Sequence, residues 1–356
     1  MPGAEYRRRR RIVVTCAEQE GNMRRITILR ACIVALALTA AYAGAPGALA
    51  QEAVRIGTSA VGSSLYVVGI GMSKMIQEKA GINSNIEPLG GSHANMFGLE
   101  RKNIELAIAN SGAAYDRYMG IAPFKSRYPI RLLAQGQSSF RWMLVRKGSG
   151  ISKPEDLVGK TIAANRKPLP EVALVASALL KEFGIAKNRL RIVSTADLEA
   201  ENRGLRTGTI SAAVMPFSLS QPVTVKLFSD GVVEPLIISR DRFDAIKSAL
   251  PDIFYTQVIR ANHYKNQPEA FPVLAMKILL AAGASLSEDA VYKVTKAIMG
   301  HHDEFAKIHA SARAWTVKNT LAEPKIPFHP GAIRYYKEIG AWNAEMDAVQ
   351  NRLLAR

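Results

Sequence analysis

The feature that most constrains the fold of this chain is an alternation of short apolar runs with longer helix-like segments, which occurs in two sets. Strands that alternate with helices of this length indicate βαβ units and a parallel sheet. In the first set we predict strands over residues 54–58, 82–89 and 104–109 and helices over 65–79, 90–101 and 113–118. In the second set we predict strands over 161–165, 191–194 and 210–215 and helices over 170–183 and 198–206.

Residues 131–146, between the two sets, receive no assignment, and from about residues 253–259 to the end we expect helices to dominate. Two similar α/β units with a helical tail predict a hinged α/β protein of two lobes with a ligand cleft between them. We expect residues 51–145 and 255–356 to form the first lobe, which includes the C-terminal helices, and residues 146–254 to form the second.

The first fifty residues are expected to be a leader that is not part of the folded protein. Met23-Arg24-Arg25 is basic, residues 31–42 are apolar, and Ala48-Leu49-Ala50 is a small-x-small cleavage site, which is the order of a secretory signal peptide. We place cleavage after Ala50 and interpret residues 1–22 as an over-extended start. A membrane anchor is the alternative, but about a dozen apolar residues fall short of the roughly 20 that a spanning helix needs. The mature protein is therefore expected to be exported.

Removing the leader changes the charge of the chain. The whole chain has a formal net charge of +17, and without the eight arginines and three glutamates of residues 1–50 it keeps +12. This net positive charge favours small anions by long-range attraction. Because the charges are interspersed and do not form a block, binding of nucleic acid is a weak inference. Cys16 and Cys32 both leave with the leader, which excludes thiol catalysis, thiolate metal sites and disulfides in the mature chain.

The most informative motif is the loop Gly57-Thr58-Ser59-Ala60-Val61-Gly62-Ser63-Ser64-Leu65-Tyr66, between a predicted strand and a predicted helix. Free backbone N–H groups at a helix N-terminus attract an anion, and a carboxylate suits this loop. The spacing is that of a phosphate-binding loop, but Ser63 occupies the position of the essential lysine, which argues against nucleoside triphosphates. The alternative is that these residues only cap the helix and form the turn.

Two further loops are predicted to end at the same edge of the sheet. Gly90-Gly91-Ser92-His93-Ala94-Asn95 opens one helix, and Asn110-Ser111-Gly112 follows the third strand. Because right-handed crossovers place the carboxyl ends of parallel strands along one edge, we expect the three loops to converge. They supply neutral donors and acceptors, which suit the orientation of a small polar molecule better than its cleavage.

Signatures of enzymes and metal sites are weak in this sequence. His302 and His309 are seven residues apart with Asp303 nearby, but no H-E-x-x-H or triad pattern surrounds them, so we prefer a solvated helix face to a metal site. No G-x-S-x-G motif occurs. We expect no catalytic residue, no metal and no cofactor.

The three loops and the C-terminal tail resemble the TAXI family, the extracytoplasmic solute receptors of tripartite ATP-independent periplasmic (TRAP) transporters. The resemblance spans roughly residues 54–340. It is carried by Ile56-Gly57-Thr58 through Tyr66, Gly90-Gly91-Ser92 with Asn95, Asn110-Ser111 with Tyr115-Asp116 to Gly120, and, most specifically, the tail Ile326-Pro327-Phe328-His329-Pro330-Gly331-Ala332-Ile333-Arg334-Tyr335-Tyr336-Lys337-Glu338-Ile339-Gly340.

The resemblance implies a two-lobed, periplasmic-binding-protein-like (type II) fold that closes on a small solute, commonly a dicarboxylate or an amino acid such as glutamate. The closed receptor then delivers the solute to a sodium-coupled membrane permease. Carried over by position, the first-lobe contacts to the ligand are Thr58, Ser59, Ser63, Ser64, Tyr66, Ser92, Asn95, Asn110 and Ser111. His329 and Tyr335 belong to the tail and are interpreted as structural, docking it on the first lobe.

The second lobe departs from the family pattern. Where the family often has a Gly/Ser-rich loop, this chain has Asn165-Arg166-Lys167-Pro168-Leu169-Pro170-Glu171, in which proline removes N–H donors and two cations are added. Gly112 also replaces an acidic residue that the family often carries. Both departures bear on which ligand is bound.

Our leading hypothesis is a non-catalytic receptor for an anionic solute. A carboxylate lies on the helix N-terminus at Ser63-Ser64, Arg166 or Lys167 closes on it from the second lobe, and Ser218 also faces the cleft. The alternative for Arg166 is a solvated surface cation. The alternatives for the function are an exported sensor that presents the solute to a membrane signalling protein, and a periplasmic enzyme.

Overall fold

The computed structural model describes residues 53–166 and 168–356. The predicted leader with its cleavage site, Cys16, Cys32 and Lys167 all lie outside the described residues. Strands and helices alternate through the first part of the described chain: β1 (Val54–Ser59), α2 (Ser64–Met75), the π-helical turn η1 (Ile76–Ala80), β2 (Ser84–Gly90), α3 (Ser92–Glu100), β3 (Leu106–Asn110), α4 (Ser111–Met119) and the long strand β4 (Ile130–Arg146).

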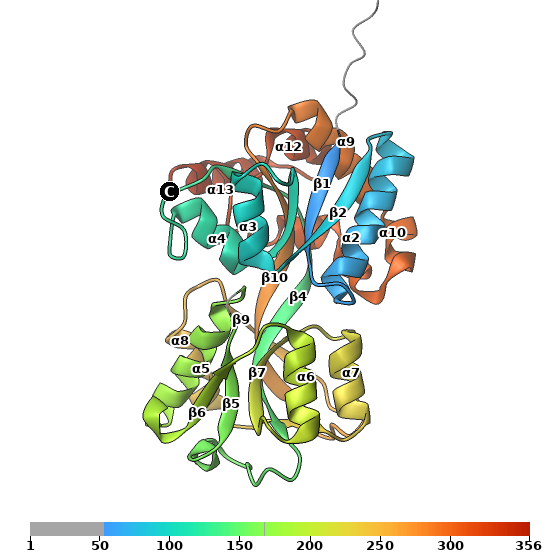
Figure 1. The fold of residues 1–356 in the computed structure, drawn as a ribbon. Coiled ribbons are helices and arrows are strands. Elements are labelled where there is room, and N and C mark those ends of the chain that lie inside the picture. The colour runs from blue at the N-terminus through green and yellow to red at the C-terminus, as the bar shows by residue number, and fades with distance from the viewer. Residues whose placement is uncertain (1–52, 167) are drawn as a thin grey trace, which may run out of the picture. The chain divides into compact units, whose positions relative to one another are not determined.

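The alternation then continues through a second set of elements and a helical tail (Figure 1). The second set is η2 (Pro154–Leu157), β5 (Thr161–Asn165), α5 (Glu171–Glu182), η3 (Lys187–Arg189), β6 (Arg191–Ser194), α6 (Leu198–Thr207), β7 (Ala212–Phe217), α7 (Pro222–Ser229), β8 (Val233–Pro235) and α8 (Arg240–Ser248). After it come β9 (Tyr255–Ile259), β10 (Phe271–Gly283), α9 (Glu288–Met299), α10 (His302–Ile308), η4 (Ala310–Ala314), α11 (Val317–Leu321), α12 (Pro330–Glu338) and α13 (Ala344–Leu354).

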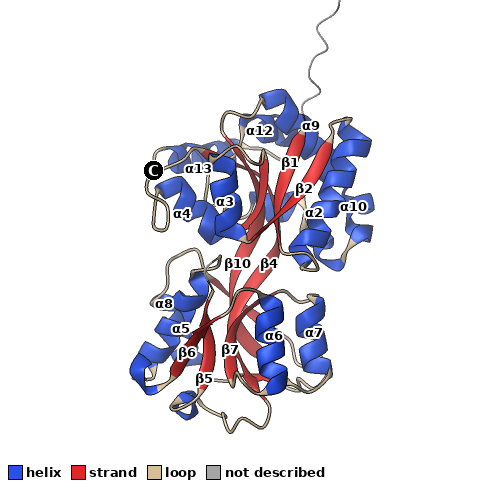
Figure 2. Ribbon diagram, viewed as in Figure 1, coloured by secondary structure: helices blue, strands red, loops and turns tan. Residues whose placement is uncertain are grey.

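The predicted βαβ pattern is confirmed in both sets, since each of the six predicted strands exists with ends within two residues of the expectation. Strands β1, β2 and β3 pair in parallel, and so do β5, β6 and β7. All lie in one sheet of order β2-β1-β3-β10-β4-β7-β5-β6, with β8 beside β4 and β9 beside β10. The long strands β4 and β10 are antiparallel to each other and run through the middle of the sheet, where they join the two parallel sets (Figure 2).

Two hydrophobic cores divide this sheet into two lobes. The first core contains residues of β1, β3 and α2, the beginning of β4, the end of β10 and the C-terminal helices, and we call this part lobe 1. The second core contains residues of β5, β7 and α5, the end of β4 and the beginning of β10, and we call this part lobe 2. Each lobe thus combines one parallel set with half of each long strand.

Helices dominate after residues 253–259 as expected, since α9 to α13 and η4 lie there, but the prediction missed one strand, β10, at Phe271–Gly283. This strand is rich in Leu, Ala and Met, which are good helix formers, and most of its residues are buried, so its sequence shows no alternation of polar and apolar residues. The predicted lobe boundaries near residues 145 and 255 remain a proposal. The cores favour changes of lobe between Ala134 and Phe140 on β4 and between Met276 and Ile278 on β10.

The tail that carries the family resemblance is docked on lobe 1. The backbone N–H of His329 donates to the Leu132 carbonyl at 2.9 Å, and the Tyr336 hydroxyl donates to the Leu133 carbonyl at 2.7 Å. Tyr335 and Tyr336 are both buried in the lobe 1 core. These contacts confirm the structural interpretation of the tail.

In residues 53–166 and 168–356, the structure contains no helix with the length and apolar character required to cross a bilayer.

Candidate ligand-binding cleft

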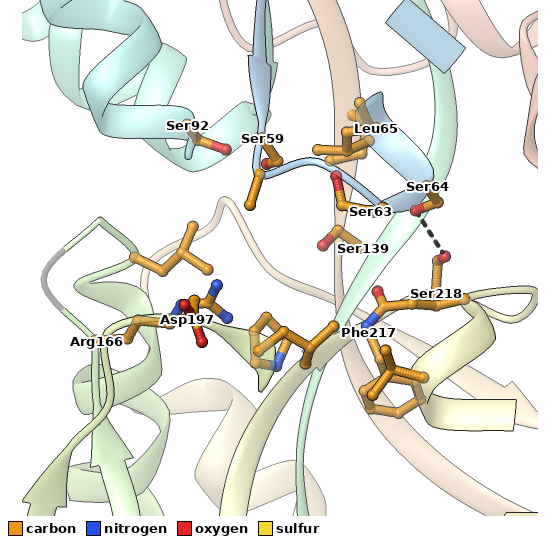
Figure 3. Close-up of a pocket in the computed structure, with 18 of the residues that line it drawn as sticks. Ser59, Ser63, Ser64, Leu65, Ser92, Ser139, Arg166, Asp197, Phe217 and Ser218 are labelled. Carbon is orange, nitrogen blue, oxygen red and sulfur yellow. Dashed lines mark hydrogen bonds between the residues drawn. The ribbon is translucent and has the colours of Figure 1, made fainter. Parts of the chain in front are cut away.

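A cavity of about 210 Å³ lies between the lobes, with walls from both of them (Figure 3). Lobe 1 contributes residues 59–65, which lead into α2, and Ser92 at the start of α3. Lobe 2 contributes residues around the ends of β5 and β7 and the start of α6, and the middle of β4 forms a further wall. The cavity therefore lies at the carboxyl ends of the parallel strands, where ligands bind in open α/β sheets.

The structure brings together about half of the residues that the sequence singled out. Those that line the cavity are Ser59, Ser63, Ser64, Ser92, Arg166 and Ser218. The first of the three predicted loops contributes three of these six, the second contributes Ser92, and the third contributes none. As ligand contacts, these residues stay predictions.

The other five predicted residues do not line this cavity. Thr58 and Asn95 are fully buried, and Asn95 donates from Nδ2 to the Ile108 carbonyl at 2.7 Å. Tyr66 contributes its backbone N–H to the cap of α2. Asn110 caps α4, and Ser111 lines a separate cavity formed with residues of β9 and β10.

The N-terminus of α2 borders the cavity. Ser63 is the N-cap and its Oγ accepts from the Tyr66 N–H at 3.2 Å. The backbone N–H groups of Ser64 and Leu65, in the first turn, have no acceptor within the helix, and both residues line the cavity. No acidic side chain lies in this turn, so the positive end of the helix dipole is left for a bound group.

Arg166 faces this helix end from lobe 2, at the end of β5. Its side chain is only 6% exposed, which excludes the alternative of a solvated surface cation. Within the described chain the guanidinium makes no hydrogen bond or ion pair, and its Nε is buried without a partner. Burial lowers the pKa of the guanidinium, because the charged form has lost its water without gaining a neutralising contact.

A second buried arginine, Arg141 on β4, donates hydrogen bonds from both of its terminal nitrogens. Its Nη2 donates to Glu171 Oε1 at 2.6 Å, and its Nη1 donates to Ser139 Oγ at 2.8 Å and to the Phe140 carbonyl at 2.6 Å. Asn110 of lobe 1 also donates to Glu171 Oε1, at 2.8 Å. Arg141 is therefore neutralised by the protein itself.

The buried polar atoms of the cavity wall that lack a partner are all donors, within the part of the chain that the structure describes. They are Arg166 Nε, Arg141 Nε and Gln137 Nε2. A buried donor without an acceptor costs about 1–3 kcal/mol, and more when it is charged. The cavity is therefore complementary to an occupant that is rich in acceptors.

Two acidic side chains lie at the rim of the cavity, at the start of α6. Asp197 caps this helix, accepting from the Ala200 N–H at 2.8 Å, and Glu199 follows it. Both are exposed, so water screens their charges, in contrast to that of Arg166. Behind them Glu201 is 1% exposed, and burial raises its pKa to about 6 although Arg166 acts against that rise.

Polar contacts connect the lobes across the cleft. The hydroxyls of Ser64 and Ser218 are 3.3 Å apart, as the dashed line in Figure 3 marks, and those of Ser220 and Ser311 are 3.1 Å apart. On another side, the Asn110–Glu171 hydrogen bond also crosses from lobe 1 to lobe 2. The lobes are in contact around the cavity in this conformation.

Sequence reasoning missed the wall that β4 supplies. Gln137, Ser138, Ser139 and Arg141 all line the cavity, but residues 131–146 had received no assignment. The available signal was the polar run from Gln135 to Ser139 inside an otherwise apolar stretch, which is unusual for a strand buried in a core.

The two histidines considered for a metal lie elsewhere. His302 is in α10 and its Nε2 is 3.3 Å from the Arg313 carbonyl, whereas His309 follows that helix and accepts from the Ser311 N–H. Among the described residues, no three His, Cys, Asp or Glu side chains lie close enough together to hold a metal ion.

Comparisons with known proteins support the fold. The model of the NMT1-like family matches residues 56–340 of this chain. MatC from Rhodopseudomonas palustris, solved with bound malate, is 13% identical with a TM-score of 0.52, and the match covers 84% of this chain and 100% of MatC. At that identity the likeness shows the fold alone, and the predicted two-lobed, periplasmic-binding-protein-like α/β fold is confirmed.

Two other solved structures are similar at lower scores. The periplasmic aliphatic sulphonate binding protein SsuA from Escherichia coli is 14% identical with a TM-score of 0.42, over 85% of this chain and 90% of SsuA. A putative L-cystine ABC transporter protein from Listeria monocytogenes is 13% identical with a TM-score of 0.46, over 72% of this chain and 94% of that one.

Proposed function

We propose, from the premise that this chain belongs to the NMT1-like family, that it is an exported, non-catalytic receptor that captures a small anionic solute between its lobes. The observation that carries this proposal is the buried, unpartnered Arg166 facing the N-terminus of α2 across the cavity. Both groups attract an anion, and they belong to different lobes. An anion that contacts both therefore stabilises the closed arrangement over an open one.

The chemistry favours a carboxylate of modest size, such as a dicarboxylate or an acidic amino acid like glutamate. An Arg–carboxylate contact is charge-assisted and contributes about 1.5–3 kcal/mol. The cavity also has apolar walls, including Leu65, Leu169 and Phe217, which suit a short carbon skeleton. MatC, which has this fold, was solved with malate, itself a small carboxylate.

We further propose that the partner is a sodium-coupled TRAP permease in the inner membrane and that the mature receptor acts in the periplasm. The resemblance of the loops and tail to the TAXI family supports this assignment. In proteoliposomes that contain the permease, solute uptake is expected to require both this receptor and a sodium gradient. Uptake that depends on ATP instead would assign the receptor to an ABC transporter.

The experiment that tests anion capture is calorimetry with matched pairs of ligands. Mass spectrometry of the purified mature protein first identifies any small molecule that it retains. The protein is then titrated with L-glutamate against L-glutamine and with succinate against its monoamide, since each pair differs by one charge at nearly constant size. We expect the more highly charged member to bind at least tenfold more tightly in one pair. Equal affinities within both pairs would contradict the proposal.

A further inference from the structure

Glu201 lies behind the cleft and has no role in the function proposed so far. It projects from α6 and is 1% exposed, and its Oε2 is buried without a partner among the described residues. Its Oε1 accepts from the Thr195 hydroxyl at 2.7 Å. A buried carboxylate with one donor is poorly stabilised as an anion, so its charge depends on neighbouring cations.

The charged groups around Glu201 come from three elements. Arg166, at the end of β5, and Arg141, on β4, favour the charged carboxylate, whereas Asp197, at the start of α6, opposes it. Thr195, whose hydroxyl donates to Glu201, also donates its backbone N–H to the carbonyl of Asn165 at 3.1 Å, and Arg166 is the next residue, so Glu201 lies near Arg166. Arg141 is already neutralised by Glu171 at 2.6 Å, which leaves Arg166 as the principal cation acting on Glu201. Conversely, among the neighbouring anions, Glu201 has the largest effect on the pKa of Arg166, which it raises.

We propose, resting on the function proposed above for Arg166, that Glu201, a buried carboxylate that forms no ion pair with Arg166, takes up a proton when an anionic solute binds Arg166. An arriving anion neutralises Arg166 and repels the charge of Glu201, and both effects favour the protonated carboxyl group. The proton comes from solvent and binds one carboxylate oxygen. The Thr195 contact survives, because a hydroxyl donates to or accepts from either form.

Linkage gives the sign of the effect. Glu201 is ionised above its pKa of about 6 in the free receptor, and anion binding raises that pKa. Affinity for the anion therefore increases as pH falls through this range. A rise of one pKa unit on binding corresponds to a roughly tenfold increase in affinity between high and low pH.

The test is calorimetry with L-glutamate and ethanesulfonate, whose own charges stay constant between about pH 5.5 and 8. Titrations near pH 6 in two buffers of different ionisation enthalpy give the number of protons taken up per bound anion. We expect a measurable uptake of up to one proton in the native protein, and an affinity up to tenfold higher at pH 5.5 than at pH 8. In Glu201→Gln we expect no uptake and a nearly flat pH profile.

The control is Glu78→Gln, an exposed carboxylate that pairs with Lys74 on the surface of lobe 1, which is expected to keep the native uptake. If Glu201→Gln does not fold, the number of protons that the native protein takes up per bound anion tests the proposal by itself. Two results overturn this proposal and leave the proposed function intact. In the first, the native protein binds the anion without proton uptake and Arg166→Met loses the binding. In the second, Glu201→Gln still takes up a proton when it binds the anion. Binding of neither probe overturns both.

Discussion

Arg141 and Arg166 are two buried arginines in the wall of one cavity, but their surroundings differ. Arg141 is 1% exposed and is held by Glu171, Ser139 and a backbone carbonyl, so its charge is satisfied within the fold. Arg166 is 6% exposed, and its side chain has no hydrogen bond or ion pair with any described residue. Arg141 therefore stabilises the folded structure, whereas the guanidinium of Arg166 is available to a bound solute.

The comparison teaches how to separate a structural charge from a functional one. A buried charge is expensive unless it is paired, and breaking a pair leaves the surviving partner uncompensated. Removing Arg141 should therefore lower the free energy of unfolding. Removing Arg166 should leave the free energy of unfolding undiminished and lower the affinity for the solute.

The largest effect is expected for Arg141→Met. The substitution keeps much of the side-chain volume but, among the described residues, leaves the buried Glu171 carboxylate with Asn110 as its side-chain hydrogen-bond donor and with no ion pair, so we expect a loss of about 3–5 kcal/mol in the free energy of unfolding. Urea unfolding followed by circular dichroism measures it. An unchanged midpoint of urea unfolding would contradict this contrast, because Arg141 would then contribute no more to stability than Arg166.

A smaller effect is expected in the pH dependence of stability, through Glu201. Its pKa in the folded protein is about 6 against an ordinary 4.5, so the folded state binds more protons between these values. Stability from this group is therefore fully present below about pH 4.5 and is lost as pH rises through 6, by about 2 kcal/mol in total. The difference in unfolding free energy between native protein and Glu201→Gln measures this slope, and a constant difference across that window would contradict it.

The smallest effect is expected at the neutral contact between the lobes. Ser218→Ala removes the hydroxyl that faces Ser64 at 3.3 Å, so the closed state loses one uncharged hydrogen bond, worth about 0.5–1.5 kcal/mol. We expect solute affinity to fall about two- to tenfold, as measured by calorimetry. Ser229→Ala on α7, whose hydroxyl bonds only within its own helix, is the matched control. A loss as large as that from removing Arg166 would show that charge does not dominate closure.

The sequence predicted the two parallel sets well, because their strands are short, bounded by turn residues and separated by helices. The long strands were missed for opposite reasons. In β10 the run of Leu, Ala and Met favours helix locally, and only its position between β3 and β4 makes it a strand. In β4 a polar run from Gln135 to Ser139 interrupts the apolar pattern, because Gln137, Ser138 and Ser139 line the cavity and Gln135 donates to the Thr320 carbonyl.

The site was predicted where local signals define it. The serines at the start of α2 follow from the geometry of a helix N-terminus, and Arg166 was singled out as an unusual cation in its loop. Asn95 and Asn110 were grouped with them by chain position, but their amides satisfy backbone and side-chain groups inside the structure. Arg141 and Glu201 could not be distinguished from surface charges, because their burial depends on packing between elements far apart in the sequence.

The central claim, that Arg166 is held unpaired for an anionic solute, is tested most directly by measuring L-glutamate affinity and unfolding free energy in Arg166→Met. Arg189→Met, which removes an exposed arginine of lobe 2, is the control. We predict that Arg166→Met weakens binding about 10- to 100-fold, equivalent to about 1.5–3 kcal/mol, with no loss of folding stability. Unchanged affinity, or a loss of stability as large as that of Arg141→Met, would contradict the account.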